Sequence, residues 1–170
     1  MLTVTEFENY EGDQSSQSYI ERLTEKTDLK IENCTFLSSG NYECYDDIIA
    51  AAGGLDLIVL GLGANAHIGY NEPATPFSSG THVQKLTDKT RVQLADRFCG
   101  ADNVPERAYT MGIKTIVSAR QIMVIALGAE KAESVFKMYY GRDDSVVPAA
   151  FLQIPSEVTV YLDPPAAEKI

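Results

Sequence analysis

The chain has 170 residues, of which 45% are hydrophobic, and its formal net charge is −10. A chain of this length and composition is expected to fold as one domain, residues 1–170, around a single hydrophobic core. The negative charge disfavours nonspecific binding to nucleic acid and to anionic lipid surfaces. We therefore expect neither nucleic acid nor membrane as a partner, and an anionic small molecule would require a local basic pocket.

The chain has three cysteines, Cys34, Cys44 and Cys99, and we expect neither a disulfide nor a metal site from them. Their odd number and the lack of paired spacing argue against a disulfide framework and against a structural zinc site. A reducing, cytoplasmic location is expected. The longest apolar run, residues 55–62, is much shorter than the roughly 20 residues that span a bilayer. No positively charged, apolar leader opens the chain.

The predicted elements alternate between strands and helices along the chain. Short apolar runs predict strands over residues 2–5, 55–60, 121–127 and 158–162. Apolar residues at helical spacing predict helices over residues 17–24, 42–52, 90–98 and 129–139, with a short helix after Asp163. The runs 55–60 and 121–127 predict strands covered on both faces. We therefore expect an α/β protein, a Rossmann-like open, mostly parallel sheet with helices on both faces.

Glycine directly follows two of the predicted strands. Gly61 comes after Leu60, and Gly128 comes after Leu127. Ligands of open parallel sheets bind beyond the carboxyl ends of the strands. We therefore expect a binding site at these strand ends, with Gly61 in contact with the substrate.

The loop that begins at Gly61 allows more than one interpretation. Residues 61–66, GLGANA, match the G-x-G-x-x-A dinucleotide fingerprint. That fingerprint opens a long apolar helix and is followed by an acidic residue at a strand end, whereas Pro73 and Pro76 follow here. The context therefore disfavours a dinucleotide.

The same loop places His67 and Glu72 five residues apart, just beyond a predicted strand. A histidine can carry a proton near neutral pH, and a nearby carboxylate can fix its tautomer and raise its basicity. The alternative is structural: His67 bonds the loop backbone and Glu72 caps a turn. A further ligand at a recognisable interval is missing, so we expect no metal site.

A longer stretch, residues 55–91, reads LDLIVLGLGANAHIGYNEPATPF and ends in THVQKLTDKTR. This stretch resembles the glucosamine-6-phosphate deaminases, whose signature is close to LGxGxxGHIxFNEP followed by a T-x-x-x-x-LT-x-x-TR segment. The likeness covers nearly the whole chain, and HIGYNEP is its specific part. The family converts glucosamine 6-phosphate and water to fructose 6-phosphate and ammonia without a cofactor. The resemblance therefore implies an amino-sugar phosphate deaminase and isomerase that needs no cofactor.

The resemblance also implies roles for individual residues. His67 matches the histidine that assists opening of the sugar ring, and Glu72 matches the glutamate that orients it. Asn65 stands two positions before the histidine, where the family has Asp or Asn. Arg97 and Lys131 match the two cations that hold the phosphate.

Two motifs near the amino terminus complete the resemblance. The segment Glu8-Asn9-Tyr10 aligns with the family's D-E-Y motif, so Glu8 matches the base that moves a proton between C2 and C1. The segment Gln17-Ser18-Tyr19 aligns with Q-S-Y, so Tyr19 is expected at the substrate site.

The match also has departures. The family begins with a strand and a glycine-rich S-G-G-[ST] phosphate loop, and neither is present, so the fold is expected to be truncated at its amino terminus. Ala66 stands where the family has glycine. A noncatalytic phosphosugar-binding relative and a galactosamine-6-phosphate isomerase remain alternatives, while Asn71-Glu72-Pro73 argues against the lactonases, which carry a G-A-D-G-H-T loop. An assembly of identical subunits is compatible with the sequence.

Overall fold

The computed structural model describes residues 1–10, 12, 15–142 and 146–170. The strands are β1 (Thr5–Phe7), β2 (Leu57–Gly61), β3 (His82–Lys85), β4 (Arg107–Thr110), β5 (Gln121–Ala126) and β6 (Val158–Leu162). The α-helices are α1 (Ser16–Thr24), α2 (Tyr45–Ala51), α3 (Asp88–Leu94), α4 (Ile113–Val117) and α5 (Ala132–Tyr140). Short 3-10 helices are η1 (Ile31–Asn33), η2 (Tyr42–Cys44), η3 (Ala95–Phe98), η4 (Ala101–Asn103), η5 (Ala129–Lys131) and η6 (Pro148–Gln153).

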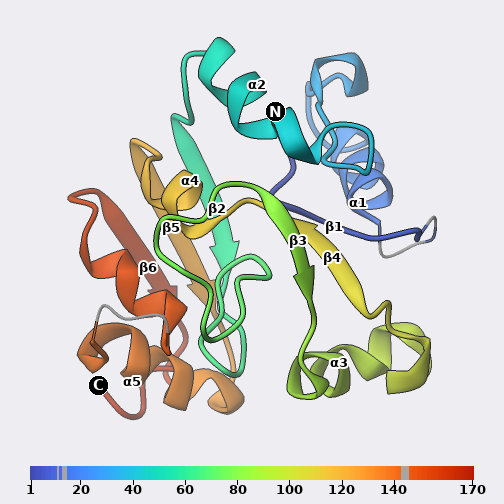
Figure 1. The fold of residues 1–170 in the computed structure, drawn as a ribbon. Helices are drawn as coiled ribbons and strands as arrows, with labels where there is room; N and C mark the ends of the chain where they lie inside the picture. Colours follow the sequence, from blue (N-terminus) through green and yellow to red (C-terminus); the bar gives the residue numbers. More distant parts are fainter. Residues whose placement is uncertain (11, 13–14, 143–145) are drawn as a thin grey trace.

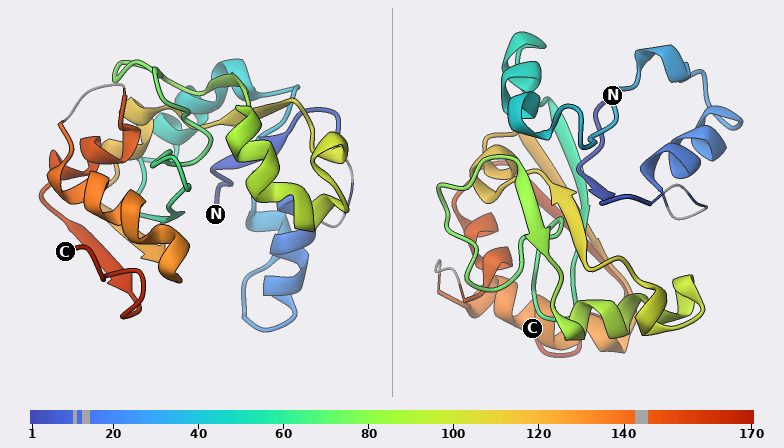
Figure 2. Two further views of the ribbon diagram at one scale, coloured as in Figure 1. Left: turned by 90° about the horizontal axis from the view of Figure 1, so that it is seen from below. Right: turned by 45° about the vertical axis from the view of Figure 1, so that its right-hand side comes forward.

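The strands form two sheets that lie beside each other (Figure 1). One sheet is parallel, in the order β2-β5-β6, and the other is antiparallel, in the order β1-β4-β3. The carboxyl ends of the parallel strands point toward the side of the molecule where α3 and α5 lie (Figure 1). Seen from below, the loop that follows β2 lies between these two helices (Figure 2).

The main core lies on one face of the parallel sheet. Alternate residues of β2 and β5, such as Ile58, Leu60, Ile122 and Val124, are buried there. Side chains of α4, α5 and η6 pack against them in the same cluster. This period-two burial holds the strand ends, and the loops that follow them, in fixed positions.

The opposite face of the parallel sheet is open, which corrects the prediction of strands covered on both faces. Leu57 and Val59 are 49% and 50% exposed, and Ile125 on β5 is 40% exposed. Both faces of β2 and β5 therefore carry apolar side chains, but the described part of the chain covers only one of these two faces.

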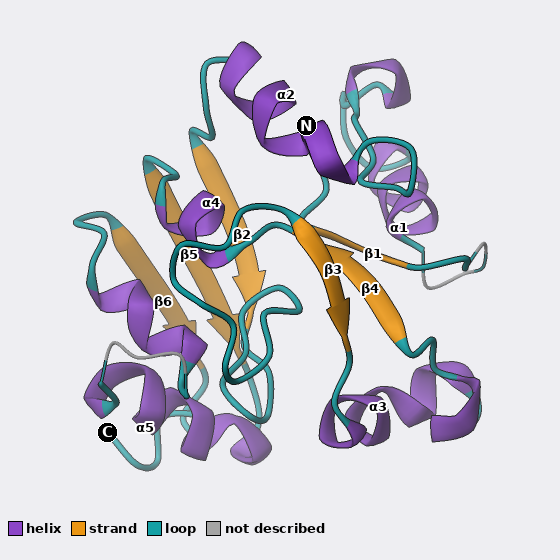
Figure 3. Ribbon diagram, in the orientation of Figure 1, coloured by secondary structure: helices purple, strands orange, loops and turns teal. Residues whose placement is uncertain are grey.

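The α/β class and the parallel sheet are confirmed (Figure 3). The helices expected over residues 17–24, 42–52, 90–98 and 129–139 form within a few residues of those bounds, partly as 3-10 turns. The antiparallel sheet was not predicted, because β4 has only 4 residues and shows no clear pattern. The strand expected over residues 2–5 forms as β1, which begins three residues later. After Asp163 the chain forms turns instead of the expected helix. None of the helices in the described part of the chain is long and apolar enough to cross a membrane.

Asp46, in the first turn of α2, ties three segments of the fold together. Its carboxylate accepts hydrogen bonds from the Thr81 amide at 3.0 Å and the Thr81 hydroxyl at 2.6 Å. It also accepts one from the Thr115 hydroxyl on α4 at 3.0 Å. The carboxylate therefore joins α2 to the start of β3 and to α4.

Replacing Asp46 with alanine is expected to destabilise the protein by about 1–3 kcal/mol more than replacing Asp47 with alanine, because three donors lose their acceptor. Asp47 is the matched control, since it lies in the same helical turn and is exposed. The measurement is the free energy of unfolding from denaturant titration. Equal losses in Asp46→Ala and Asp47→Ala would contradict the assigned role.

Candidate functional site

A cavity of about 410 Å³ opens at the carboxyl end of β2. It is lined by Gly61, the loop after β2, Tyr70, residues of α3 and η3, and Lys131 at the start of α5. The site therefore lies where the sheet architecture predicts ligand binding, beyond the end of a parallel strand. His67, Arg97 and Lys131 all line this cavity.

His67, Asn65 and Glu72 form a hydrogen-bonded chain at this cavity. The Oδ1 atom of Asn65 lies 2.6 Å from Nδ1 of His67 and accepts the His67 amide at 3.2 Å. The Nδ2 group of Asn65 donates to Oε2 of Glu72 at 2.6 Å. The carboxylate lies 3.8 Å from Nδ1 of His67, so Asn65 mediates the contact between the two groups.

This arrangement selects one tautomer of the imidazole. The Glu72 carboxylate only accepts, so Asn65 must turn its NH₂ group toward Glu72 and its oxygen toward His67. An oxygen at 2.6 Å from Nδ1 requires a proton on that nitrogen. Among the described residues, no hydrogen bond involves Nε2, so in the neutral ring its lone pair is available to a ligand.

Glu72 is itself fixed by the helix that begins at the site. Its side chain is buried, with 1% of the residue exposed, and Oε1 accepts from the Thr87 amide at 3.0 Å and from the Thr87 hydroxyl at 3.2 Å. Thr87 is also the N-cap of α3, and its hydroxyl accepts the Thr90 amide. The hydroxyl of Thr90 lies 3.4 Å from Nδ1 of His67. The N-terminus of α3 therefore anchors both ends of the chain of polar groups.

The loop after β2 brings the backbone unusually close to the imidazole. A Cβ atom on Gly63 would overlap the His67 ring, so only glycine fits at this position. Ala66, just before the histidine, has a φ of 64°. This conformation is unfavourable for a residue with a side chain, by about 1–2 kcal/mol. The loop therefore holds local strain beside the histidine, as functional loops often do.

Burial is the main cause that lowers the pKa of His67 below its ordinary value of 6.5. The Glu72 carboxylate acts in the opposite direction, and the charge of Lys131 adds to the lowering. The imidazole is therefore neutral at physiological pH and able to accept a proton. Burial also raises the pKa of the Tyr70 phenol, so this group at the cavity wall remains a hydrogen-bond donor.

Two cations face the cavity, in a chain that is otherwise acidic. The ammonium of Lys131 donates to the Leu62 carbonyl at 2.8 Å. Burial lowers the pKa of Lys131, the Glu130 charge raises it, and the nearby Arg97 charge lowers it further. None of the ion pairs among the described residues involves Arg97 or Lys131. Their charges are therefore available to an anion in the cavity.

The remaining predicted site residues lie at different distances from this cavity. Tyr19 lines a smaller adjoining cavity together with Arg97 and Tyr70. Glu8 does not line either cavity in the described part of the chain, and its carboxylate contacts Arg107 Nε at 3.3 Å. The structure thus brings the predicted His67, Asn65, Glu72, Gly61, Arg97 and Lys131 together and leaves Glu8 outside both cavities.

Four further residues at the site were not predicted. Thr87 and Thr90 fall in the quoted LTDKT segment, where a threonine just before the predicted helix is an N-cap signal. Tyr70 lies inside the HIGYNEP segment. Glu6 lines the adjoining cavity with Arg97, and burial raises its pKa although amides of Phe7 and Ser16 donate to it. The motif at residues 8–10 aligned on Glu8, and no sequence signal pointed to Glu6.

The imidazole of His67 is expected to titrate with a midpoint below 6.5, because burial disfavours its charged form. The chain contains two histidines, so NMR spectra of the wild type and of His82→Gln assign the signal. The unfolded chain binds the proton more readily, so the stability due to neutral His67 is complete above the unfolded pKa of about 6.5 and is lost as the pH falls toward the folded pKa. His67→Gln should flatten the pH dependence of the free energy of unfolding in that range. A midpoint above 6.5 would contradict this.

Comparisons with known proteins show the family to which the chain belongs. Residues 14–161 match the family model described as glucosamine-6-phosphate isomerases/6-phosphogluconolactonase. A glucosamine-6-phosphate deaminase of Halalkalibacterium halodurans is 42% identical over 155 residues, which cover 87% of this chain and 63% of that protein. One of Clostridioides difficile is 40% identical over 167 residues, covering 94% of this chain and 67% of that protein.

Solved structures show the same fold. A monomeric glucosamine-6-phosphate deaminase superposes with a TM-score of 0.93 at 34% identity, covering 99% of this chain and 74% of that one. A 6-phosphogluconolactonase from Trypanosoma brucei gives a TM-score of 0.75 at 18% identity and so supports the fold alone. The chain spans less than two thirds of the length of the Halalkalibacterium relative. The sequence, the fold and the loop carrying His67 and Glu72 place the chain in the glucosamine-6-phosphate isomerase/6-phosphogluconolactonase family.

Proposed function

We propose that the chain is a deaminase and isomerase of amino-sugar phosphates, which converts glucosamine 6-phosphate and water to fructose 6-phosphate and ammonia. One observation carries the proposal: a neutral imidazole with an available Nε2 faces the same cavity as two cations without ion-pair partners among the described residues. The relatives named as glucosamine-6-phosphate deaminases support the choice of substrate.

Ring opening is the step that fits His67. The C1–O5 bond of the pyranose breaks when the O1 hydroxyl loses its proton and O5 gains one. A neutral imidazole accepts the first proton at Nε2 and can deliver it to O5. The Asn65 oxygen stabilises the imidazolium that forms between these transfers. It accepts a hydrogen bond from Nδ1–H in both the neutral and the charged ring.

Phosphate binding is the role that fits Arg97 and Lys131. A guanidinium can hold two phosphate oxygens, and an ammonium offers a compact charge. The charge of Arg97 acts to lower the pKa of Lys131, so the two cations repel each other and an anion between them relieves that repulsion. Tyr19, in the adjoining cavity, can contact the same end of the sugar.

Isomerisation requires a base that moves a proton from C2 to C1, after which water replaces the amine at C2 and ammonia leaves. We assign this role to Glu8 from the family motif. Its carboxylate contacts Arg107; the two side chains are 22% and 53% exposed, and an ion pair this open to solvent contributes only about 0–1 kcal/mol. Glu8 lines neither cavity, so this role requires its carboxylate to leave Arg107 and turn toward the sugar. Glu6 is the alternative carboxylate, since it lines the adjoining cavity together with Arg97.

The proposed chemistry uses no metal ion or cofactor, because acid–base groups and cations of the chain account for each step. We also propose a cytoplasmic location, in keeping with three free cysteines in the described part of the chain and a small metabolic substrate.

The direct test is incubation of the chain at high concentration with glucosamine 6-phosphate. Ammonia and fructose 6-phosphate should appear in equal amounts, and the His67→Gln variant should lose most of this turnover. The 4-epimer, galactosamine 6-phosphate, tests the substrate choice. Binding of glucosamine 6-phosphate in calorimetry without turnover would instead support a noncatalytic phosphosugar-binding protein.

The Gly63→Ala variant is expected to lose roughly a hundredfold in kcat, because a methyl group there displaces the His67 ring by an ångström or more. Gly40→Ala is the matched control, since its methyl group would meet nothing closer than Ser38 Oγ at 3.8 Å. Steady-state kinetics and unfolding curves are measured for both variants. Full activity of a folded Gly63→Ala variant would argue against His67 as the catalytic group.

A Glu8→Gln variant is expected to lower kcat by about 10²–10⁴, the usual contribution of a general base, with little change in KM. A Glu6→Gln variant tests the alternative carboxylate with the same change of charge. Measuring kcat across pH shows which carboxylate is the base. Only loss of the base removes the fall in kcat at low pH that is caused by its protonation. A large loss in Glu6→Gln with a normal Glu8→Gln variant would transfer the role to Glu6.

A further inference from the structure

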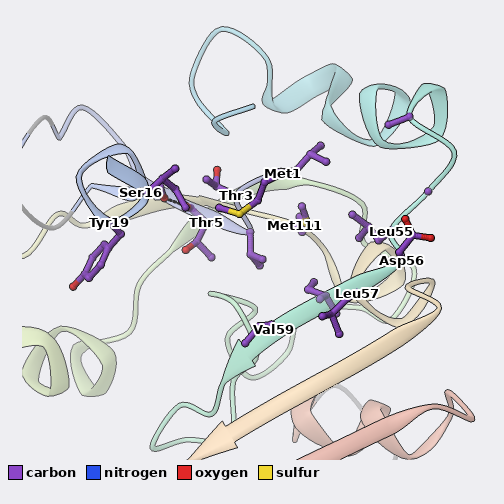
Figure 4. Close-up of a pocket in the computed structure, with 16 residues that line it drawn as sticks. Met1, Thr3, Thr5, Ser16, Tyr19, Leu55, Asp56, Leu57, Val59 and Met111 are labelled. Carbon is purple, nitrogen blue, oxygen red and sulfur yellow. Dashed lines mark hydrogen bonds between the residues drawn. The ribbon is translucent and has the colours of Figure 1, made fainter. Parts of the chain in front are cut away.

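The phenol of Tyr70 lies where the two cavities of the site meet. Among the described residues, Thr5, Tyr70 and Arg97 line both the cavity at the end of β2 and the adjoining cavity, which has a volume of about 130 Å³. Figure 4 shows Thr5 of β1 beside Ser16 and Tyr19 of α1, which also line the adjoining cavity. Tyr70 and Arg97 therefore face the same space from two different segments of the chain.

The hydroxyl of Tyr70 is a feature of this chain. The family signature HIxFNEP has phenylalanine at this position, whereas the segment here reads HIGYNEP. A phenylalanine at this position offers no hydroxyl to a ligand. The role of the Tyr70 hydroxyl is therefore additional to the chemistry that the signature carries.

The Tyr70 ring is held in place by two other rings and by its own backbone. Its centroid lies 5.4 Å from that of Phe7 and 6.1 Å from that of His67. The Tyr70 amide donates to the Thr110 hydroxyl at 3.1 Å, and Thr110 is fully buried. A side chain fixed in this way loses little conformational freedom when its hydroxyl binds a ligand.

The same group of rings anchors Arg97. Its neighbour Phe98 packs edge-on against Phe7, with centroids 5.1 Å apart, and Phe7 contacts Tyr70 in turn. Both phenylalanines belong to the second buried cluster of the protein. The guanidinium and the phenol are therefore carried by side chains that share one rigid support.

The Tyr70 hydroxyl is a donor that has no acceptor in the described part of the chain. Burial raises its pKa, although the charge of Arg97 acts to lower it, so the phenol stays protonated at neutral pH. A phosphate monoester is mostly a dianion at neutral pH, because its second pKa is about 6. A phosphate at Arg97 is therefore a matching acceptor for this O–H group.

The Glu6 carboxylate is a poorer acceptor for the same group, although it lines the adjoining cavity. Its Oε1 atom accepts the Phe7 amide and its Oε2 atom accepts the Ser16 amide, both at 2.8 Å. Both oxygens are therefore already engaged with the backbone, and neither bonds Tyr70 among the described residues.

We propose that Tyr70 is a specificity-determining residue whose hydroxyl donates a hydrogen bond to the substrate phosphate held by Arg97. The proposal rests on the proposed function for the identity of the phosphosugar, and it adds a contact that this function did not include. The hydroxyl should raise the affinity of the site for phosphorylated ligands.

The Tyr70→Phe variant tests the contact, because it removes the hydroxyl and keeps the ring. Binding is measured by calorimetry with inorganic phosphate and with glucitol 6-phosphate, which has no carbonyl or amine and so undergoes no turnover. Affinity for both should fall about tenfold or more, as expected when a hydrogen bond to a charged group is lost. With glucosamine 6-phosphate as substrate, KM should rise by a similar factor while kcat changes little.

Tyr10→Phe is the matched control. Tyr10 packs against the same Phe7 and Phe98, with centroids 5.8 and 5.1 Å away, and it lines neither cavity. Its loss of a hydroxyl should leave the affinity for phosphate unchanged. Unfolding curves of both variants show whether the cluster is intact.

A measurement on the unaltered chain keeps the proposal testable even if Tyr70→Phe folds poorly. The chain contains nine tyrosines, and carbon-13 at Cζ gives one NMR signal for each. The Tyr70 and Tyr10 signals are identified by their absence from the two variants, or by tyrosine labelling at a single position. Inorganic phosphate should shift the Tyr70 signal, because its hydroxyl gains an acceptor, and should leave the Tyr10 signal in place.

Each outcome decides the proposal. An unchanged affinity for inorganic phosphate in folded Tyr70→Phe, equal losses in both variants, or a Tyr70 signal that phosphate does not move would overturn it. A loss in kcat at unchanged phosphate affinity would also overturn it, since the hydroxyl would then act on the chemistry.

The contact and the proposed function can fail separately, because binding is measured without turnover. A tenfold loss of glucitol 6-phosphate affinity in a chain that does not turn over glucosamine 6-phosphate supports the contact and counts against the function. Turnover by the wild type together with unchanged phosphate affinity in Tyr70→Phe overturns the contact alone.

Discussion

The buried carboxylate of Glu72 is the group on which the geometry of the site depends. Leaving such a charge buried without partners would cost several kcal/mol, and here donors from two segments satisfy it. Asn65 transmits its position to His67, while Thr87 ties it to the start of α3. The carboxylate therefore makes the loop after β2 and the N-terminus of α3 into one rigid unit around the imidazole.

The fold supports this unit from two directions. The parallel sheet fixes the start of the loop, because alternate residues of β2 and β5 are buried against α4, α5 and η6. The antiparallel sheet fixes its far end, because the side-chain Nδ2 group of Asn71 donates to the Met111 carbonyl at 2.8 Å, just beyond β4. Strain at Ala66 and the close approach at Gly63 are tolerated because both ends of the loop are held. Arg97 and Lys131 supply local positive charge at the site, although the net charge of the chain is −10.

Much of this arrangement could be predicted from the sequence, and the failures have physical causes. The helices and the parallel strands follow from apolar periodicity, and the strand end before Gly61 indicated the place of the site. Leu57 and Val59 were expected to be buried because they are apolar, yet periodicity cannot tell whether a covering layer is present. Strand β4 is too short for a pattern to emerge. The roles of Thr87 and Asn65 depend on contacts between segments, which local sequence does not specify.

The proposed role of His67 depends most directly on the proton that its ring carries at Nδ1. Nitrogen-15 NMR of the imidazole distinguishes the two neutral tautomers, because protonated and unprotonated ring nitrogens resonate far apart. At a pH above the His67 midpoint, Nδ1 should show the shift of a protonated nitrogen and Nε2 that of an unprotonated one. The reverse pattern would place a proton on Nε2, break the link through Asn65 to Glu72, and contradict the proposed role of the histidine as the proton acceptor.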